Sequence, residues 1–144
     1  MNEFENKIVL ITGGADGIGK GCVMRFVEQG ATVLIGDIQE VRGRALANEL
    51  GSSTHFIPLD VTDNKSWKDA VELITKDFGS LHVLVNNAGI SARNSIEDMD
   101  LIEWQAIHSV NVDGIFLGCH HVIPLMHASG GGSIVTISSA LGLK

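Results

Sequence analysis

The sequence predicts an α/β fold in which a doubly wound parallel sheet carries helices on both faces. Short apolar segments rich in β-branched residues alternate with longer amphipathic segments along all 144 residues. This alternation is typical of parallel strands joined by helical crossovers. No internal repeat or low-complexity linker interrupts it. The length is that of one ordinary domain, so we expect a single domain over residues 1–144.

Strands are predicted where short runs of apolar residues lie between turn signals. Most of these runs are apolar at consecutive positions rather than at alternate ones, as expected of strands that are buried on both faces. We therefore expect strands at residues 7–11, 31–36, 54–59, 81–86 and 133–138.

Helices are predicted in the segments between these strands. A glycine follows the first three of them, at the place where glycine commonly ends a helix, and Asp63 or Asn64 can cap the third. Pro124 is expected to bend or end the last turn of the fourth. The predicted helices cover residues 17–29, 39–50, about 64–78 and 101–128, and a loop occupies residues 87–100.

Composition argues against several classes of function. Asp and Glu number 17 against 10 Lys and Arg, a net charge of −7, which opposes binding to nucleic acid. No apolar run approaches the roughly 20 residues that cross a bilayer. The acidic start does not look like a signal peptide, so we expect a cytoplasmic protein without a membrane partner. The histidines lack the spacing of a ligand set, and we expect no metal site.

A glycine-rich turn, residues 12–19, joins the first predicted strand to the first helix. Gly13 permits a sharp turn, Gly17 lets the backbone approach a pyrophosphate, and Gly19 allows the helix to pack closely on the strand. The N–H groups of the first helical turn then face the phosphate charge. A purely structural turn is the alternative, but its place directly after a buried strand favours a dinucleotide site.

Asp37 ends the second predicted strand. A carboxylate at this place accepts hydrogen bonds from the ribose hydroxyls of NAD and repels the 2′-phosphate of NADP. Asp16 and Ile38 are the positions expected nearest to that phosphate, and neither is basic, so NAD is favoured over NADP. Arg42 is the residue that could reverse this preference. Asp37 could also cap the helix that starts near residue 39.

Together these motifs resemble those of the short-chain dehydrogenase/reductase family. The turn Thr12-Gly13-x-x-x-Gly17-Ile18-Gly19 has the family's glycine spacing, which differs from the G-x-G-x-x-G of other Rossmann enzymes. Four further motifs follow in the family's order over almost the whole chain. They are Asp60-Val61, Asn86-Asn87-Ala88-Gly89, Asn111 within the long helix, and Ser138-Ser139-Ala140-Leu141-Gly142.

The resemblance implies a Rossmann-type sheet with strand order 3-2-1-4-5, and it implies which residues bind the cofactor. Asp60 and Val61 would contact the adenine ring. Asn87, Ala88 and Gly89 would stabilise the central sheet and border the adenosine side of the cofactor. With the residues of the glycine-rich turn, they form the expected cofactor site.

Two residues are implied to be catalytic. Ser139, three residues before Gly142, would hydrogen-bond the substrate oxygen, although it could be an ordinary polar residue at the end of a strand. Asn111 would interrupt its helix and hold a water that links the catalytic lysine to solvent. A surface-facing asparagine is the competing interpretation.

The mechanism that the resemblance implies also needs a tyrosine as general acid/base, with a lysine four residues later. The sequence contains no tyrosine, and Lys144 cannot be that lysine because residue 140 is alanine. General acid–base help is worth about 10²–10⁴ in rate, so we expect the chain alone to be inactive or nearly so. Relative to the family the domain is C-terminally incomplete, which would leave the strand at 133–138 as a bare sheet edge. We favour, in this order, a piece of a longer enzyme, a prematurely terminated product, and a short binding protein.

The sequence thus favours an NAD(H)-dependent oxidoreductase that transfers hydride between nicotinamide and a secondary alcohol or ketone. The alternative is a non-catalytic NAD-binding module or an inactive truncated product. A methyltransferase that uses S-adenosylmethionine would share the glycine-rich turn, but not the Asn86–Gly89 and Ser138-Ser139 motifs. Residues 90–96 could overhang the substrate, whose identity the sequence leaves open. The complete protein is expected to be a homo-oligomer, either a dimer or a tetramer.

Overall fold

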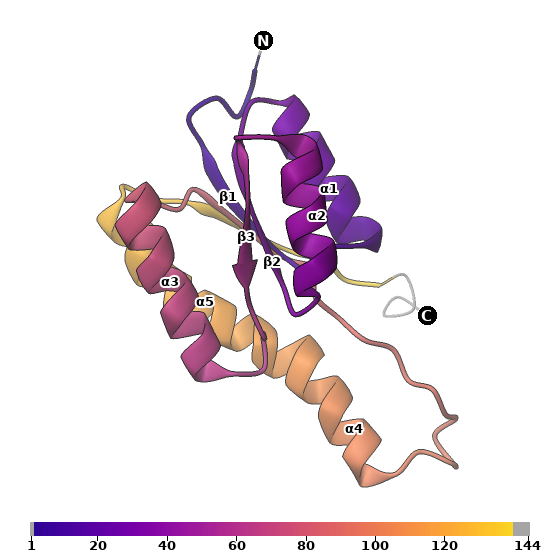
Figure 1. The fold of residues 1–144 in the computed structure, drawn as a ribbon. Helices are drawn as coiled ribbons and strands as arrows, with labels where there is room; N and C mark the ends of the chain where they lie inside the picture. Colours follow the sequence, from indigo (N-terminus) through magenta and orange to yellow (C-terminus); the bar gives the residue numbers. More distant parts are fainter. Residues whose placement is uncertain (1, 140–144) are drawn as a thin grey trace.

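A computed structural model of the protein describes residues 2–139. Its strands form one parallel sheet in the order β3-β2-β1-β4-β5 (Figure 1). The predicted fold class and strand order are confirmed. The strands are β1 (Ile8–Thr12), β2 (Thr32–Asp37), β3 (Thr54–Pro58), β4 (Val83–Asn86) and β5 (Ser133–Thr136).

Helices cover both faces of the sheet. α1 (Gly17–Glu28) and α2 (Glu40–Leu50) lie together on one side, and α3 (Asn64–Phe78) and α5 (Gly114–Ala128) lie on the other (Figure 1). A further helix, α4 (Leu101–His108), precedes α5 and lies beside the long loop after β4.

The central strands bury side chains on both of their faces. Leu10 and Leu84 belong to the core that contains residues of α3 and α5. Ile11 and Val85, the next residues of the same strands, belong to the core that contains residues of α1 and α2. Successive side chains of a strand point to opposite faces, so a sheet that is covered twice needs apolar residues at consecutive positions. This explains the sequence pattern of the strands.

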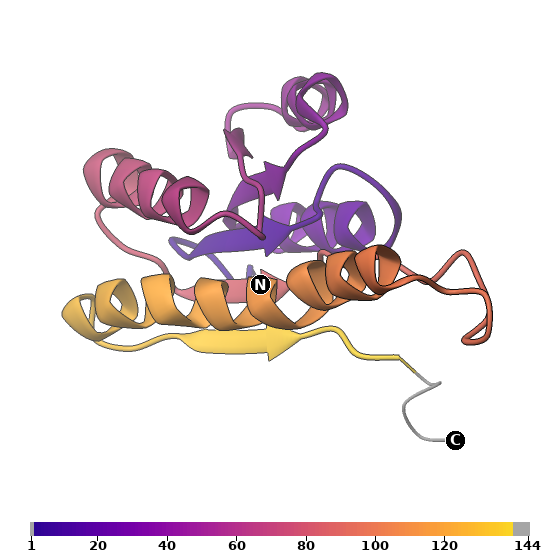
Figure 2. The ribbon, with the colours of Figure 1, turned by 90° about the horizontal axis from the view of Figure 1, so that it is seen from below.

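The long helix predicted over residues 101–128 is interrupted. A π-helical turn, η1 (Ser109–Asp113), separates α4 from α5, and Figure 2 shows the two helices following one another in a line. The interruption that the resemblance implies at Asn111 is therefore present, and the segment 101–128 is two helices rather than one. Gly114 follows the π-helical turn and lies against Val61, whose Cγ2 atom would be 3.0 Å from a Cβ at this position. Pro124, which was expected to bend or end the last turn, lies inside α5 and does not end it.

Several strand boundaries in β1, β2 and β3 differ from the prediction by one residue, and two boundaries, in β4 and β5, differ by two. β4 begins at Val83 rather than at residue 81, and β5 ends at Thr136 rather than at residue 138. The parallel pairing of β4 with β5 covers only these four residues of each strand. β5 is the outermost strand of the described sheet, and its Val135 is 45% exposed. Among the described residues, no strand pairs with the outer side of β5.

His82 connects the starts of β1 and β4 in a way that makes stability depend on pH. Its Nδ1 atom accepts a hydrogen bond from the backbone N–H of Ile8 at 3.0 Å, so the bond requires a neutral imidazole. Burial, and to a lesser degree the charge of Lys7, lower the pKa of His82 below its usual 6.5. The unfolded chain therefore binds more protons than the folded chain, and the free energy of unfolding should fall as the pH falls through about 6.5.

Urea unfolding between about pH 7.5 and about pH 5.5 checks this expectation. His82→Gln is the matched variant because its amide can accept a hydrogen bond but does not titrate in this range. Burial also lowers the pKa of His121, so part of the pH dependence should remain in the variant. A fall in stability as large as that of the unmodified chain would contradict the assignment to His82.

Candidate functional site

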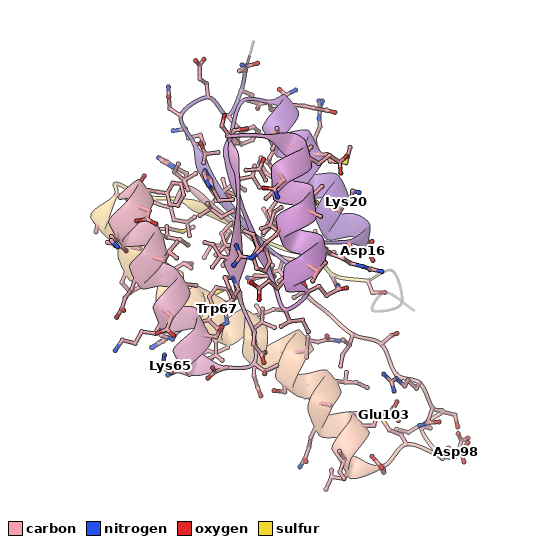
Figure 3. All side chains as sticks on the ribbon, viewed as in Figure 1. Asp16, Lys20, Lys65, Trp67, Asp98 and Glu103 are labelled. Carbon is pink, nitrogen blue, oxygen red and sulfur yellow. The ribbon has the colours of Figure 1, made fainter. Side chains whose placement is uncertain are left out.

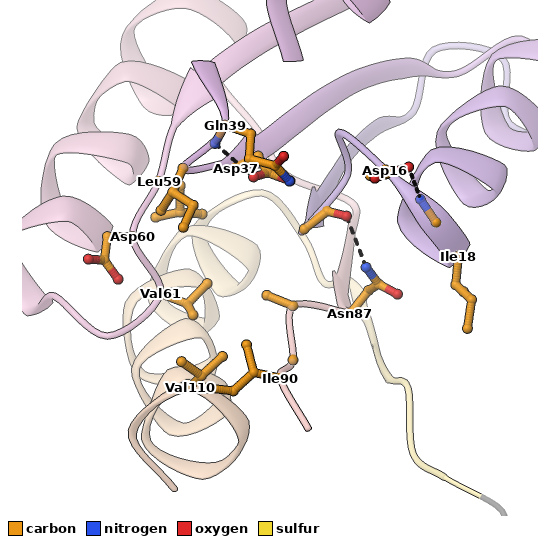
Figure 4. Close-up of a pocket in the computed structure, with 15 residues that line it drawn as sticks. Asp16, Ile18, Asp37, Gln39, Leu59, Asp60, Val61, Asn87, Ile90 and Val110 are labelled. Atoms are coloured by element: carbon orange, nitrogen blue, oxygen red, sulfur yellow. Dashed lines mark hydrogen bonds between the residues drawn. The ribbon is translucent and has the colours of Figure 1, made fainter. Parts of the chain in front are cut away.

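A cleft of about 500 Å³ lies at the carboxyl ends of the strands. Strand order reverses between β1 and β4, and ligands of open α/β sheets bind at such reversals. The walls are the glycine-rich turn and the segments that follow β2, β3 and β4 (Figure 4). All the predicted cofactor residues except Gly19 line this one cleft: Gly13, Asp16, Gly17, Ile18, Asp37, Ile38, Asp60, Val61, Asn87, Ala88 and Gly89.

The glycine-rich turn has a conformation that other residues would strain. Gly13 has φ of +63° and Gly17 has φ of +55°, in the left-handed region that favours glycine. No atom lies within 4 Å of where a Cβ of Gly17 would be, so this side of the turn is open to a ligand. Gly19 is different: a Cβ there would collide with the carbonyl oxygen of Gly13 and lie 2.5 Å from Nδ2 of Asn87. Gly19 therefore does not line the cleft. Its lack of a side chain leaves room for the backbone of Gly13 and the side chain of Asn87, and so allows the turn to take this conformation.

Asn87 and Thr12 join the turn to the end of β4. The side-chain Nδ2 of Asn87 donates to the backbone oxygens of Thr12 at 2.9 Å and Gly13 at 3.1 Å. The hydroxyl of Thr12 accepts from the backbone N–H groups of Asn87 and Ala88, both at 3.0 Å. These bonds fix the two walls of the cleft relative to each other.

The carboxylate of Asp37 is buried at the floor of the cleft and is 6% exposed as a residue. Oδ2 accepts the backbone N–H of Ala15 at 3.0 Å, and Oδ1 accepts that of Gln39 at 2.9 Å. The predicted second use of Asp37 at the start of α2 is therefore present, because Gln39 directly precedes that helix and makes no side-chain cap of its own. A carboxylate offers about four acceptor sites, so acceptor capacity remains for a ligand.

Acidic side chains also form the rim of the cleft. Asp16 caps α1 by accepting the backbone N–H of Gly17 at 2.8 Å, and its other oxygen forms an ion pair with Arg42 at 2.6 Å. Oδ1 of Asp60 accepts both the backbone N–H and the hydroxyl of Thr62, at 2.9 and 2.7 Å. No lysine or arginine belongs to the lining described for the cleft.

Asn111 lies in the π-helical turn, where its helix is interrupted. Its Nδ2 donates to the carbonyl of Ile90 at 2.8 Å, and its Oδ1 accepts the N–H of Ile90 at 2.9 Å. The amide therefore holds the backbone just after β4. Because Ile90 lines the cleft, Asn111 shapes this wall without lining it.

Ser139 is exposed and lies three residues beyond the end of β5. It is on the same carboxyl edge of the sheet as the cleft, but it is not among the lining residues. The rest of the predicted serine motif, residues 140–142, and Lys144 lie outside the described residues.

Three lining residues were not predicted: Gln39, Leu59 and Val110. Each is adjacent in sequence to a predicted site residue, namely Ile38, Asp60 and Asn111, so the neighbours of the motifs were the signal that could have found them. Ile90 also lines the cleft, and it begins the segment that was expected to overhang the substrate. Val110 lies in the π-helical turn.

A second cavity of about 410 Å³ shares Ile90 with the cleft. Along it, the carboxylate of Glu103 on α4 accepts the backbone N–H groups of Arg93 and Asn94 and the side-chain amide of Asn94. These hydrogen bonds hold the pKa of Glu103 below its usual value. The predicted overhanging segment, residues 90–96, is thus attached to α4 (Glu103 is labelled in Figure 3).

Two features are absent from residues 2–139. Within this range, no group of three or more His, Cys, Asp or Glu side chains is arranged to hold a metal ion. None of the helices in the same range has the length and apolar character to cross a membrane.

Comparison with known proteins identifies close relatives. The chain is 47% identical over 137 residues to 3-alpha-(or 20-beta)-hydroxysteroid dehydrogenase of Mycobacterium tuberculosis, covering 95% of this chain and 53% of that protein. It is 42% identical over 146 residues to trans-4-hydroxycyclohexanecarboxylate dehydrogenase of Sinomonas cyclohexanicum, covering 95% and 56%. The chain therefore spans about half the length of these curated relatives.

A solved structure shows the same fold. It is a 3-ketoacyl-(acyl-carrier-protein) reductase from Brucella melitensis complexed with NADH, which is 33% identical and superposes with a TM-score of 0.89. The match covers 94% of this chain and 58% of that one. The family model for short chain dehydrogenase matches residues 7–144. The chain belongs to the short-chain dehydrogenase/reductase family.

Proposed function

We propose that this chain forms the cofactor-binding part of an NAD(H)-dependent oxidoreductase that interconverts a secondary alcohol and a ketone. The observation that supports the proposal most is the cleft at the strand reversal, where the glycine-rich turn and Asp37 lie together. The glycine-rich turn would supply N–H groups for a pyrophosphate, and Asp37 would supply a carboxylate for a ribose.

The residues of the cleft have the chemistry that binding of a dinucleotide requires. The open side of Gly17 and the first turn of α1 would receive the pyrophosphate, because the first N–H groups of a helix have no partner within it. Asp37 would accept hydrogen bonds from the adenosine ribose, with Ile38, Asp60 and Val61 around the adenine. When bound, NAD supplies the acceptor for the hydride.

The names of the relatives and the rest of the site support a substrate class for the proposal. Both curated relatives are named for secondary alcohols on alicyclic compounds, and we propose an alcohol of this class for the protein. Ser139 would hydrogen-bond its oxygen. Residues 90–96, which Glu103 attaches to α4, would lie over the substrate, and Asn111 would position this segment through Ile90.

A second candidate function is a non-catalytic NAD-binding module. The 144 residues include the predicted cofactor residues of the cleft but no tyrosine, the residue that the family's reaction uses as general acid/base. The two candidates share the binding step and differ in turnover.

Titration of NADH fluorescence with the purified chain tests the shared step. We expect saturable binding, and we expect Asp37→Ala to weaken it by roughly tenfold or more because hydrogen bonds to a charged group are lost. S-adenosylmethionine should not displace NADH. Displacement, or no binding of NADH, would contradict the proposal.

Turnover then separates the two candidates. A form of the protein that contains the tyrosine and lysine should oxidise an alicyclic secondary alcohol such as cyclohexanol with NAD⁺. Tight NADH binding with no turnover of any secondary alcohol by such a form would favour the binding module.

A further inference from the structure

The ion pair between Asp16 and Arg42 connects two helices across the rim of the cleft. Oδ2 of Asp16 lies 2.6 Å from Nη1 of Arg42, which belongs to α2. Oδ1 of the same carboxylate caps α1 through the N–H of Gly17. Asp16 itself lines the cleft (Figure 4), so the guanidinium is held within hydrogen-bonding distance of a lining atom.

This ion pair differs from the other arginine pairs among the described residues. Arg25 pairs with Glu28 and Arg44 with Glu40, each within one helix. Arg42 reaches a residue 26 positions away on another element. Both side chains of the Asp16–Arg42 pair are 62% exposed, and exposed ion pairs contribute little to stability. The pair therefore matters chiefly because it fixes where Arg42 lies and partners the charge of its guanidinium.

The charges at this end of the cleft decide between two cofactors. NADP(H) differs from NAD(H) by a phosphate on the adenosine ribose, and an arginine near the ribose carboxylate accommodates that phosphate. Here the carboxylates of Asp37 and Asp16 line the cleft, and Arg42 pairs with the second of them. A phosphate that approached Arg42 would have to displace a carboxylate and would then face its repulsion.

We propose that Asp16 determines cofactor specificity by holding Arg42, which is a latent ligand for the 2′-phosphate of NADP(H). The inference rests on the proposed function, because it concerns the same cleft. It goes further in assigning the selection against NADP(H) to a pair of residues rather than to Asp37 alone. It predicts that releasing Arg42 is enough to raise the affinity for NADPH relative to NADH.

Asp16→Ser tests the proposal. Serine keeps a helix-capping oxygen but is too short to hold Arg42. We expect the ratio of NADPH affinity to NADH affinity, measured by fluorescence titration, to rise by roughly tenfold or more, because a phosphate–arginine contact is charge-assisted. Asp16→Asn, which keeps the size of the side chain, should move the ratio in the same direction. Thermal unfolding of each variant verifies that the fold is kept.

Two further variants separate release of Arg42 from simple loss of negative charge. In Asp16→Ser/Arg42→Ala the gain in the ratio should disappear, since no guanidinium is left to bind the phosphate. Glu40→Gln is the matched control: it removes one charge from α2 and releases Arg44 from its partner, and it should change the ratio far less than Asp16→Ser.

The outcomes also distinguish this inference from the function on which it rests. If the chain binds NADH and Asp16→Ser leaves the ratio unchanged, or raises it equally with and without Arg42, the inference is wrong and the proposed function stands. If neither the chain nor any folded variant binds either dinucleotide, both are wrong.

Discussion

Gly19→Ala should weaken NADH binding by about 100-fold or more. The new Cβ would collide with the carbonyl oxygen of Gly13 and lie 2.5 Å from Nδ2 of Asn87. The oxygen belongs to the backbone and cannot rotate away, so the turn that faces the cleft has to move. If the N–H groups that would receive the pyrophosphate move, several hydrogen bonds to the cofactor are lost together. A 100-fold loss of affinity corresponds to about 2.7 kcal/mol of binding free energy. Overpacking should also destabilise the fold by about 1–3 kcal/mol. Fluorescence titration and urea unfolding measure the two effects.

Gly21→Ala is the matched control in the same helix. No atom lies within 4 Å of where the Cβ of Gly21 would be. Alanine is the better helix former by about 1 kcal/mol, so this variant should bind NADH as the unmodified chain does and be at least as stable. Gly19→Ala with unchanged affinity would show that the turn can yield, and the role assigned to Gly19 would then be wrong.

Trp67→Ala should destabilise the protein by about 3–5 kcal/mol. Trp67 is fully buried between the sheet and α5, and its indole Nε1 donates to the carbonyl of Val61 at 3.0 Å. The substitution leaves a large cavity and removes the partner of that carbonyl. This is a large part of the 5–15 kcal/mol by which domains are usually stable. The midpoint of urea unfolding measures the loss. Because Val61 lines the cleft, NADH affinity should fall as well.

The second tryptophan of the chain provides the control. Trp104 on α4 is 46% exposed and lies against the ring of His108. Trp104→Ala removes the same atoms from a site that is open to solvent, so it should cost less than about 1 kcal/mol. Trp67→Phe keeps a ring but loses the hydrogen bond, so its loss of stability should lie between those of Trp67→Ala and Trp104→Ala. Equal losses at Trp67 and Trp104 would contradict the place of Trp67 in the core.

The sequence by itself determined the fold class, the order of elements and most of the cleft. These depend on local rules: apolar runs bounded by turns, and glycines at positions with left-handed φ such as Gly13 and Gly17. The carboxyl ends of parallel strands meet at one edge of a sheet, so motifs such as Asp37 and Asn87 were predictable as neighbours before any distance was known. The roles of Ser139 and Asn111 came from resemblance and remain proposals.

Only the tertiary structure decided the features that depend on contacts between distant segments. The resemblance implied an interruption at Asn111, but only the structure shows that it is a π-helical turn of residues 109–113 and that Asn111 bonds to Ile90, 21 residues away. The pair of Asp16 with Arg42 likewise joins residues that no local pattern relates. Helix propensity and hydrophobic periodicity describe only near neighbours along the chain. Contacts between distant parts of the fold override these local tendencies. Those contacts determine where Val110 and Arg42 lie.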